Sequence, residues 1–308
     1  MRTRGLVAFC IAFSVILLSV AVGFASAPVF LTITDVDSTD FPAISVFLNA
    51  WDSNGIPLEQ LTVQNIYIQE DDRAEKHPDE IQPIIDAQLS VVLVMDVSGS
   101  MVGEPLLDAQ GAANRFLDKL GKSDQAALIA FSSNVNTDPT VLNGDREVGF
   151  SNNLTAAYDL IDGLQAGGGT EVYNAVEKAV RMASSLPSGH RAVLLFTDGK
   201  NDPVDVGAPD NAINLAKENQ IPIFVIGLGS EIDEDYLQRI TSETGGFYRS
   251  TPRSSELSTL FTDMATLLKT SYILSYQSGI EDGNGLHELK VRLVSPQGEG
   301  VANSTLNV

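Results

Sequence analysis

The chain has 308 residues, of which 44% are hydrophobic, enough for one large domain with a smaller companion or for two to three modest domains. Its 40 acidic and 19 basic residues give a formal net charge of −21. This charge argues against nucleic acid as a partner, because phosphates would be repelled. It argues equally against an electrostatic attachment to anionic lipid.

Residues 1–27 have the pattern of a targeting segment. Arg2 and Arg4 precede an uncharged apolar run from Leu6 to Phe24, and the small residues Ala25-Ser26-Ala27 follow it. This pattern predicts a cleaved signal peptide and a secreted or cell-surface protein. The alternative is an uncleaved N-terminal anchor, because the run is long enough to span a bilayer. Contact with a membrane is expected only in that case. The single cysteine, Cys10, lies inside this run, so the exported part has no disulfide and no cysteine-ligated metal.

The segments 28–86 and 271–308 are rich in predicted strands. Alternating, β-branched stretches predict strands at 30–34, 43–51, 63–69, 271–276 and 287–294. The acidic stretch 70–80 and the Gly/Asp/Asn-rich stretch 279–285 predict a loop and a turn. Neither segment is large enough to bury a core alone. We therefore expect them to fold together as one small all-β sandwich, with residues 87–270 inserted between them.

The middle segment, 87–270, alternates apolar strands with helical patterns, which is typical of a parallel sheet covered on both faces. It predicts an α/β fold with a doubly wound, mostly parallel, Rossmann-like sheet. Strands are expected at 90–95, 126–131, 191–196, 221–227 and 247–249, and 140–142 is a candidate for a short edge strand. Helices are expected at 105–120, 153–164, 171–186, 211–219, 234–244 and 256–268.

Short hydroxyl and carboxylate side chains gather where the predicted strands of this segment end. Asp96, Ser98 and Ser100 follow the first strand directly, Thr170 follows three glycines before a helix, and Asp198 follows the strand 191–196. The carboxyl ends of parallel strands lie at one edge of a sheet, where ligands bind. Oxygen donors of this kind suit Mg²⁺, which takes six oxygens and keeps some waters. The pattern predicts a metal site.

These five positions resemble the metal-ion-dependent adhesion site of the von Willebrand factor type A (VWA) family. The Asp-x-Ser-x-Ser loop, the Gly-Gly-Thr before a helix and the Thr-Asp-Gly after a strand match in order and context, from about Gln88 to Thr270. The resemblance implies the same α/β fold and an intact site.

The resemblance also implies a role for each of the five residues. Ser98, Ser100 and Thr170 would be direct ligands, whereas Asp96 and Asp198 would act partly through water or by orienting the hydroxyls. The ion would be Mg²⁺, with Mn²⁺ or Ca²⁺ as alternatives. A carboxylate from an Asp or Glu of a partner protein would complete the metal shell. We therefore expect an exported, non-enzymatic protein that mediates cation-dependent protein binding or adhesion.

Other readings of the same residues remain open. Ser98 and Ser100 alone would serve as helix caps, Thr170 as an N-cap, and Asp198-Gly199 as an ordinary turn. The acidic residues Asp202, Asp205 and Asp210 are read either as a second cation site or partner-selecting rim, or as a solvated acidic loop.

Two alternative functions compete with cation-dependent binding. One is a structural or assembly role in a cell-envelope complex, and the less favoured one is metal-assisted hydrolysis. Hydrolysis would need a general base, and the three exported histidines, His77, His190 and His287, belong to no motif. We expect each of them at the surface.

Overall fold

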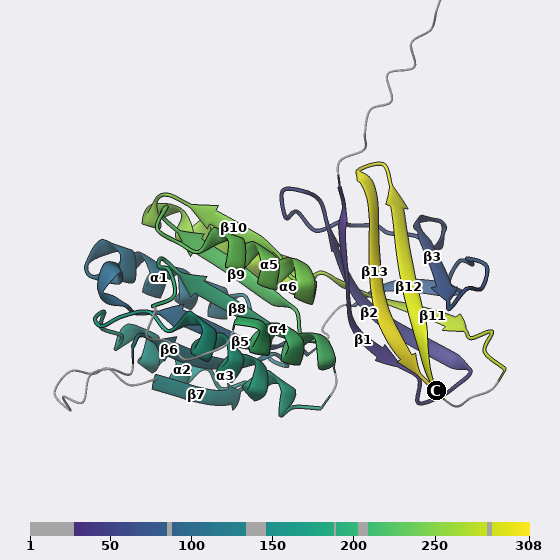
Figure 1. The fold of residues 1–308 in the computed structure, drawn as a ribbon, viewed down its shortest axis with the longest axis horizontal. Coiled ribbons are helices and arrows are strands. Elements are labelled where there is room, and N and C mark those ends of the chain that lie inside the picture. Colours follow the sequence, from purple (N-terminus) through teal and green to yellow (C-terminus); the bar gives the residue numbers. More distant parts are fainter. Residues whose placement is uncertain (1–27, 85–87, 134–145, 188, 203–208, 282–284) are drawn as a thin grey trace, which may run out of the picture.

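The computed structural model describes residues 28–84, 88–133, 146–187, 189–202, 209–281 and 285–308. The predicted targeting segment, the candidate strand at 140–142 and Asp205 lie outside these residues. None of the described helices is both long and apolar enough to cross a membrane. The chain forms an α/β domain packed against a β-sandwich (Figure 1).

A six-stranded sheet lies at the centre of the α/β domain, in the order β10-β9-β8-β5-β6-β7. The edge strand β7 runs antiparallel to β6, and the other neighbouring pairs are parallel. Every residue of β5, β8 and β9 is buried, because both faces of the sheet are covered. The strands are β5 (Ser90–Asp96), β6 (Gln125–Phe131), β7 (Arg146–Ser151), β8 (Arg191–Thr197), β9 (Ile223–Leu228) and β10 (Tyr248–Thr251).

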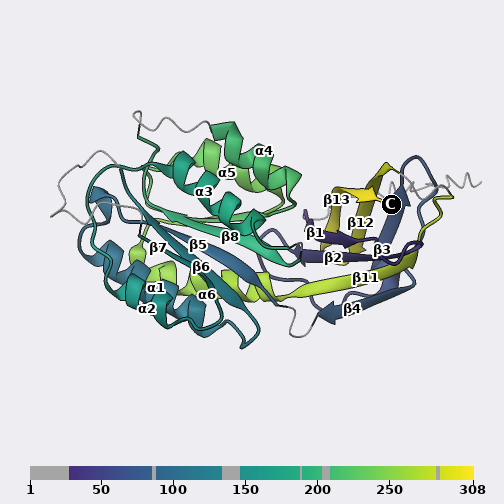
Figure 2. The same cartoon turned by 90° about the horizontal axis from the view of Figure 1, so that it is seen from below.

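Two layers of helices cover this sheet (Figure 2). Along β5, Val91 and Leu93 pack with α1, α2 and α6, whereas Val92 and Val94 pack with α3, α4 and α5, as the alternation of side chains along a strand requires. The helices are α1 (Glu104–Asp118), α2 (Thr155–Asp162), α3 (Val172–Ser184), α4 (Pro209–Glu218), α5 (Glu234–Thr244) and α6 (Leu257–Lys269). This architecture confirms the predicted fold class.

The sandwich consists of two antiparallel sheets, each built from both ends of the chain. In one sheet β11 lies between β2 and β4, and β1 pairs with the far side of β2. In the other sheet β12 lies between β13 and β3. The N- and C-terminal segments therefore share one core. The strands are β1 (Phe30–Asp37), β2 (Ala43–Trp51), β3 (Ile66–Glu70), β4 (Glu80–Ile84), β11 (Ser271–Gln277), β12 (Leu286–Ser295) and β13 (Gly298–Asn307).

Three observed strands were absent from the prediction, and the strand predicted at 63–69 starts three residues later, at Ile66. The strand β4 contains Pro83, which normally argues against a strand but is tolerated here because β4 is an edge strand. The strands β7 and β13 are polar and contain glycine, so their pairing partners rather than their own propensity hold them extended. Residues Val63–Asn65, predicted as strand, form a 3₁₀ turn (η1), in which Asn65 Oδ1 accepts the Thr62 backbone N–H at 2.9 Å.

The sandwich packs against the end of the central sheet where β8 and β9 begin. Trp51, the last residue of β2, is buried in the core of the α/β domain rather than in the core of the sandwich. Its ring centroid lies 6.0 Å from that of Phe224 and 5.9 Å from that of Phe247. Asn49 Nδ2 donates to the carbonyls of Leu267 and Thr270, at 3.2 and 3.1 Å. The two units therefore share a continuous interface.

The prediction that His190 lies at the surface is wrong. The residue is 8% exposed at this interface, and its Nε2 lies 3.4 Å from Ser271 Oγ. Burial lowers the pKa of its imidazole to about 4, although the Asp124 carboxylate partly opposes this shift. The apolar interface, which brings residues distant in sequence together, accounts for the difference.

Candidate metal centre

The five predicted site residues lie on three segments at the edge of the sheet remote from the sandwich. Asp96 is the last residue of β5, and Asp198 directly follows β8. These two strands are parallel neighbours with Met95 opposite Phe196, so they end side by side. Thr170 precedes α3, which packs on both strands.

Backbone hydrogen bonds hold the three segments against one another. The Gly99 N–H donates to Gly168 O at 3.0 Å, and the Gly167 N–H donates to Val97 O at 2.8 Å. The Asp202 N–H donates to Thr170 O at 2.7 Å. The loop after β5, the glycine loop and the loop after β8 are thus fixed relative to one another without help from the site's own side chains.

Two serine hydroxyls converge on one carboxylate oxygen. Ser100 Oγ donates to Asp198 Oδ1 at 2.8 Å, and Ser98 Oγ lies 3.4 Å from the same oxygen. The two hydroxyl oxygens are 3.0 Å apart. Ser98 is buried and Ser100 is exposed, so this group of oxygens opens to solvent on one side.

Asp96 lies beneath this group and is fully buried. Its Oδ1 accepts the Ser98 N–H at 2.8 Å, and its Oδ2 accepts the Thr197 hydroxyl at 2.6 Å. Burial raises the pKa of Asp96 to about 6, and the nearby Asp198 charge adds a smaller contribution in the same direction. Burial also raises the pKa of Asp198. Two carboxylates in this position create a negative potential that a cation would relieve.

Thr170 faces the loop that follows β8. A Cβ built on Gly199 would lie 3.2 Å from Thr170 Oγ1, so the hydroxyl lies against the residue next to Asp198. Thr170 is 9% exposed. The structure thus brings Asp96, Ser98, Ser100 and Asp198 into one hydrogen-bonded group and places Thr170 at its border.

The alternative reading as helix caps does not fit these hydroxyls. The helix α1 begins after Gly103, and α3 begins after Glu171. Neither helix has a side-chain capping hydrogen bond at that position. Ser98, Ser100 and Thr170 are therefore not held in place by the need to satisfy helix N–H groups.

Two further residues support the site and were not predicted as part of it. Thr197 ties β8 to Asp96 through the hydrogen bond described above. Ser133 Oγ accepts the Gly169 N–H at 2.8 Å and so supports the glycine loop. The position of Thr197, directly before Asp198 at a strand end, is a signal that could have identified it. Ser133 carries no such signal, because only the fold brings it to the loop.

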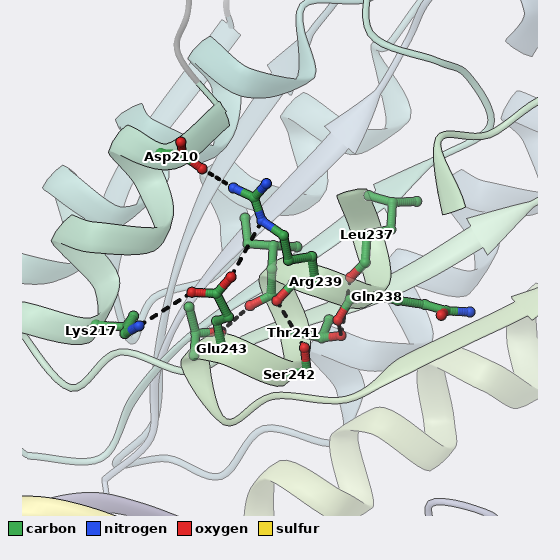
Figure 3. Close-up of polar contacts among 10 residues, drawn as sticks. Asp210, Lys217, Leu237, Gln238, Arg239, Thr241, Ser242 and Glu243 are labelled. Atoms are coloured by element: carbon green, nitrogen blue, oxygen red, sulfur yellow. Dashed lines mark hydrogen bonds and ion pairs between the residues drawn. The ribbon is translucent and has the colours of Figure 1, made fainter. Parts of the chain in front are cut away.

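The acidic residues after β8 do not form one cluster in the described part of the chain. Asp210 lies in the first turn of α4 and is ion-paired with Arg239 of α5. Arg239 Nε also lies 3.4 Å from Glu243 Oε1, and Glu243 Oε2 lies 3.2 Å from Lys217 Nζ (Figure 3). Asp210 thus belongs to a surface ion-pair network between α4 and α5. This arrangement argues against a role for Asp210 in a second cation site.

The donor set at the sheet edge fits a hard cation. Within the described residues, no three His, Cys, Asp or Glu side chains gather as a metal-binding group, so an ion here depends on hydroxyl oxygens together with the two carboxylates. All of these donors are oxygens, which suit Mg²⁺ and similar ions, whereas zinc is usually bound by nitrogen and sulfur. Asp96, Ser98, Ser100, Thr170 and Asp198 are the residues that would hold the ion directly or through water.

The fold and this arrangement define an α/β domain with an oxygen-rich site at the carboxyl edge of its sheet. The family model of the von Willebrand factor type A domain matches residues 90–263. The chain belongs to this family.

Relatives are found among animal proteins. The chain is 30% identical over 207 residues to inter-alpha-trypsin inhibitor heavy chain H4 of Bos taurus, covering 61% of this chain and 22% of that protein. The human heavy chain H4 is 29% identical over 205 residues, covering 61% and 21%. The match thus spans about a fifth of the length of these relatives.

Among the solved structures that share the fold are two with TM-scores of 0.50 and above. One is the von Willebrand factor type A protein from Catenulispora acidiphila, with a TM-score of 0.51 and 14% identity, covering 92% of this chain and 74% of that one. The other is proximal thread matrix protein 1 of the mussel byssus, with a TM-score of 0.50 and 18% identity, covering 64% and 50%.

Proposed function

We propose that the chain binds a divalent cation through Ser98, Ser100 and Thr170, with Asp96 and Asp198 orienting these ligands or binding through water. Through this ion the chain holds a carboxylate of a partner protein. The observation that carries the proposal is the convergence of two non-capping serine hydroxyls on Asp198 Oδ1. Membership of the family supports a role in protein interaction or adhesion.

The arrangement of charges favours Mg²⁺ or Mn²⁺ with an external anion. The hydroxyl ligands are neutral, and both oxygens of Asp96 are already hydrogen-bonded within the protein. An ion bound beside them is poorly neutralised by the chain itself, so it attracts a further anionic oxygen from the solvent side. When bound, the ion supplies a Lewis-acidic point of attachment for a partner's Asp or Glu side chain.

We infer that this site serves binding rather than catalysis. His190 lies at the opposite end of the sheet, against the sandwich, and His77 and His287 lie within the sandwich. No imidazole is therefore placed to act as a general base at the metal-facing edge. The targeting pattern of residues 1–27 supports a secreted or cell-surface location, where adhesion to another protein would take place.

Calorimetric titration of the full chain with Mg²⁺, Mn²⁺ and Ca²⁺ tests this function. Asp198→Ala and Ser100→Ala should each weaken Mg²⁺ or Mn²⁺ binding by about tenfold or more. The exposed Asp159 of α2 offers a matched control, and Asp159→Ala should leave binding unchanged. Equal cation affinity in all four proteins would overturn the proposal.

The same ion should hold a carboxylate, which acetate probes directly. Mn²⁺ bound to the wild-type chain should lose part of its exchangeable water when acetate is added, measured as a fall in water proton relaxation enhancement. Acetamide, which has the same shape without the charge, should not cause the fall. No fall with either compound would argue for a purely structural ion, and an equal fall with both would contradict a preference for a carboxylate.

A further inference from the structure

Two large apolar side chains lie exposed directly beyond the candidate metal loop. Val102 is 65% exposed and Leu107 is 67% exposed. Among the described residues of the α/β domain, these are the large apolar side chains that stay exposed. The other exposed ones, Phe30, Ile56, Leu286, Val294 and Val301, lie in the sandwich.

The local backbone ties Val102 to the metal loop and places Leu107 in the first turn of the helix that follows. The Met101 N–H donates to Ser98 O at 3.0 Å, and the Val102 N–H donates to Gly99 O at 3.4 Å, so Val102 is fixed to the turn that contains Ser100. Gly103, with φ of 94°, then turns the chain into α1. The Leu107 N–H donates back to Gly103 O at 3.3 Å.

Burial of neighbouring residues explains why these two side chains point outward. Met101 is fully buried and Leu106 is 7% exposed. In the sequence pairs Met101-Val102 and Leu106-Leu107, the first side chain therefore lies in the core and the second is exposed. A polar residue at 102 or 107 would serve the fold equally well. Single exposed apolar residues are ordinary on a protein surface. Two of them within the seven residues that follow Ser100, on a domain whose other large apolar side chains are not exposed in its described part, need a further reason.

We propose that Val102 and Leu107 form a docking surface beside the metal. It fits a partner segment in which the metal-binding Asp or Glu is adjacent to an aliphatic or aromatic residue. This inference rests on the proposed function and names the partner chemistry of the same site. The partner's carboxylate would meet the ion, and its apolar neighbour would cover Val102 and Leu107, which removes both apolar groups from water.

The charge of the chain favours an apolar neighbour over further acidic residues. The net charge is −21, and the exposed Glu104 lies between Val102 and Leu107 in the sequence. A partner surface rich in carboxylates would be repelled everywhere except at the ion. One acidic residue next to an apolar side chain gains the contact with the ion without that repulsion.

Four ten-residue peptides that differ only around one central acidic position test the proposal. Their central triplets are Leu-Glu-Leu, Ser-Glu-Ser, Lys-Glu-Lys and Leu-Gln-Leu, and each peptide carries the same fluorophore for anisotropy titration. The full chain is titrated in Mn²⁺ and in EDTA. The protein variants are the double substitution Val102→Ser with Leu107→Ser and, as a matched control, Val301→Ser, which changes an exposed valine of β13.

The wild-type chain in Mn²⁺ should bind the Leu-Glu-Leu peptide about tenfold more tightly than the Ser-Glu-Ser peptide. The double variant should lose this preference while its affinity for Mn²⁺ and for the Ser-Glu-Ser peptide stays unchanged, which also shows that it is folded. Val301→Ser should keep the preference.

With the wild-type chain, two results overturn the proposal: equal binding of the Leu-Glu-Leu and Ser-Glu-Ser peptides, or tightest binding of the Lys-Glu-Lys peptide. A leucine preference that survives in the double variant overturns it as well. A leucine preference that persists in EDTA and depends on Val102 and Leu107 supports the docking surface but contradicts the metal-based function, so the two failures are distinguishable.

Discussion

The Thr197 hydroxyl donates a 2.6 Å hydrogen bond to Asp96 Oδ2, which joins the last residue of β8 to the last residue of β5 in the interior of the protein. Both residues are fully buried. The bond fixes the ends of the two strands relative to each other. Ser98 and Asp198, which follow these strand ends, then lie close together, with Ser98 Oγ 3.4 Å from Asp198 Oδ1. The metal-facing edge therefore depends on a residue that would not itself touch the ion.

Replacing Thr197 by valine tests this support. Valine keeps the shape of threonine but leaves Asp96 Oδ2 without its donor, so the free energy of unfolding should fall by about 2 kcal/mol. Urea denaturation measures the loss. Thr262 of α6, whose hydroxyl donates to Ser258 O within the same helix, provides the control. Thr262→Val should change stability by about 0.5 kcal/mol or less, and a similar loss in both variants would contradict a special role for Thr197.

Glycine at position 199 keeps Thr170 close to the loop after β8. In Gly199→Ala, the new methyl group would lie 3.2 Å from Thr170 Oγ1 and would displace it. Affinity for Mg²⁺ should therefore fall about tenfold. In α1, Gly111 has open space around its Cβ position. Gly111→Ala should leave Mg²⁺ binding intact and raise stability by about 0.5–1 kcal/mol. Calorimetry and urea denaturation report the two effects separately.

The sequence predicted the central domain well because its pattern is strong. Continuous apolar runs such as Val91–Met95 are typical of strands buried on both faces. Apart from β7, which was not predicted, the order of strands and helices from β5 to α6 agrees with the prediction. Asp96, Ser98, Ser100 and Asp198 follow strand ends, so the parallel topology brings them to one edge. Thr170 lies before α3 instead, and the hydrogen bonds of the glycine loop hold it near them.

The features that the sequence did not predict depend on contacts between residues distant in the sequence. The strand β13 has little strand propensity of its own, and it is extended because β12 pairs with it from Leu286↔Asn307 to Ser295↔Gly298. Burial of His190 and insertion of Trp51 into the other unit result from an interface that no local pattern describes. The position of Thr197 at a strand end is visible in the sequence, but its hydrogen bond to Asp96, 101 residues away, depends on the fold.

We predict that Trp51 couples the unfolding of the sandwich to that of the α/β domain. It is the single tryptophan of the chain and is 1% exposed within the α/β core. Trp51→Ala should lower the free energy of unfolding by about 3–5 kcal/mol, because a large cavity remains. In Trp51→Phe the loss should be about 1 kcal/mol; among the described residues, the indole Nε1 has no hydrogen-bond partner to lose.

Tryptophan fluorescence in the wild-type chain also reports directly on this interface. Its urea transition should coincide with the transition followed by far-ultraviolet circular dichroism. A fluorescence change that precedes the loss of secondary structure would mean that the two units separate before they unfold.

Burial of His190 makes the free energy of unfolding depend on pH in the acidic range. Its pKa in the folded protein, about 4, lies below the ordinary value of 6.5, so the unfolded chain binds a proton first as the pH falls. The stability associated with this residue is therefore complete above pH 6.5 and is lost progressively toward pH 4. Between pH 6.5 and pH 5 the loss should be about 2 kcal/mol.

Comparison of the wild-type chain with His190→Gln isolates this effect from other titrating groups. The difference in unfolding free energy between the two proteins should shrink as the pH falls from 7 to 5, measured by urea denaturation in EDTA. A difference that is independent of pH would contradict the assignment.

Anomalous diffraction from crystals of the full chain grown with Mn²⁺ tests the metal site most directly. We expect one strong peak with Ser98 Oγ, Ser100 Oγ and Thr170 Oγ1 around it, and a coordination position that faces solvent. A peak elsewhere on the molecule, or a peak whose shell is closed entirely by the protein, would contradict binding of a partner's carboxylate through the ion.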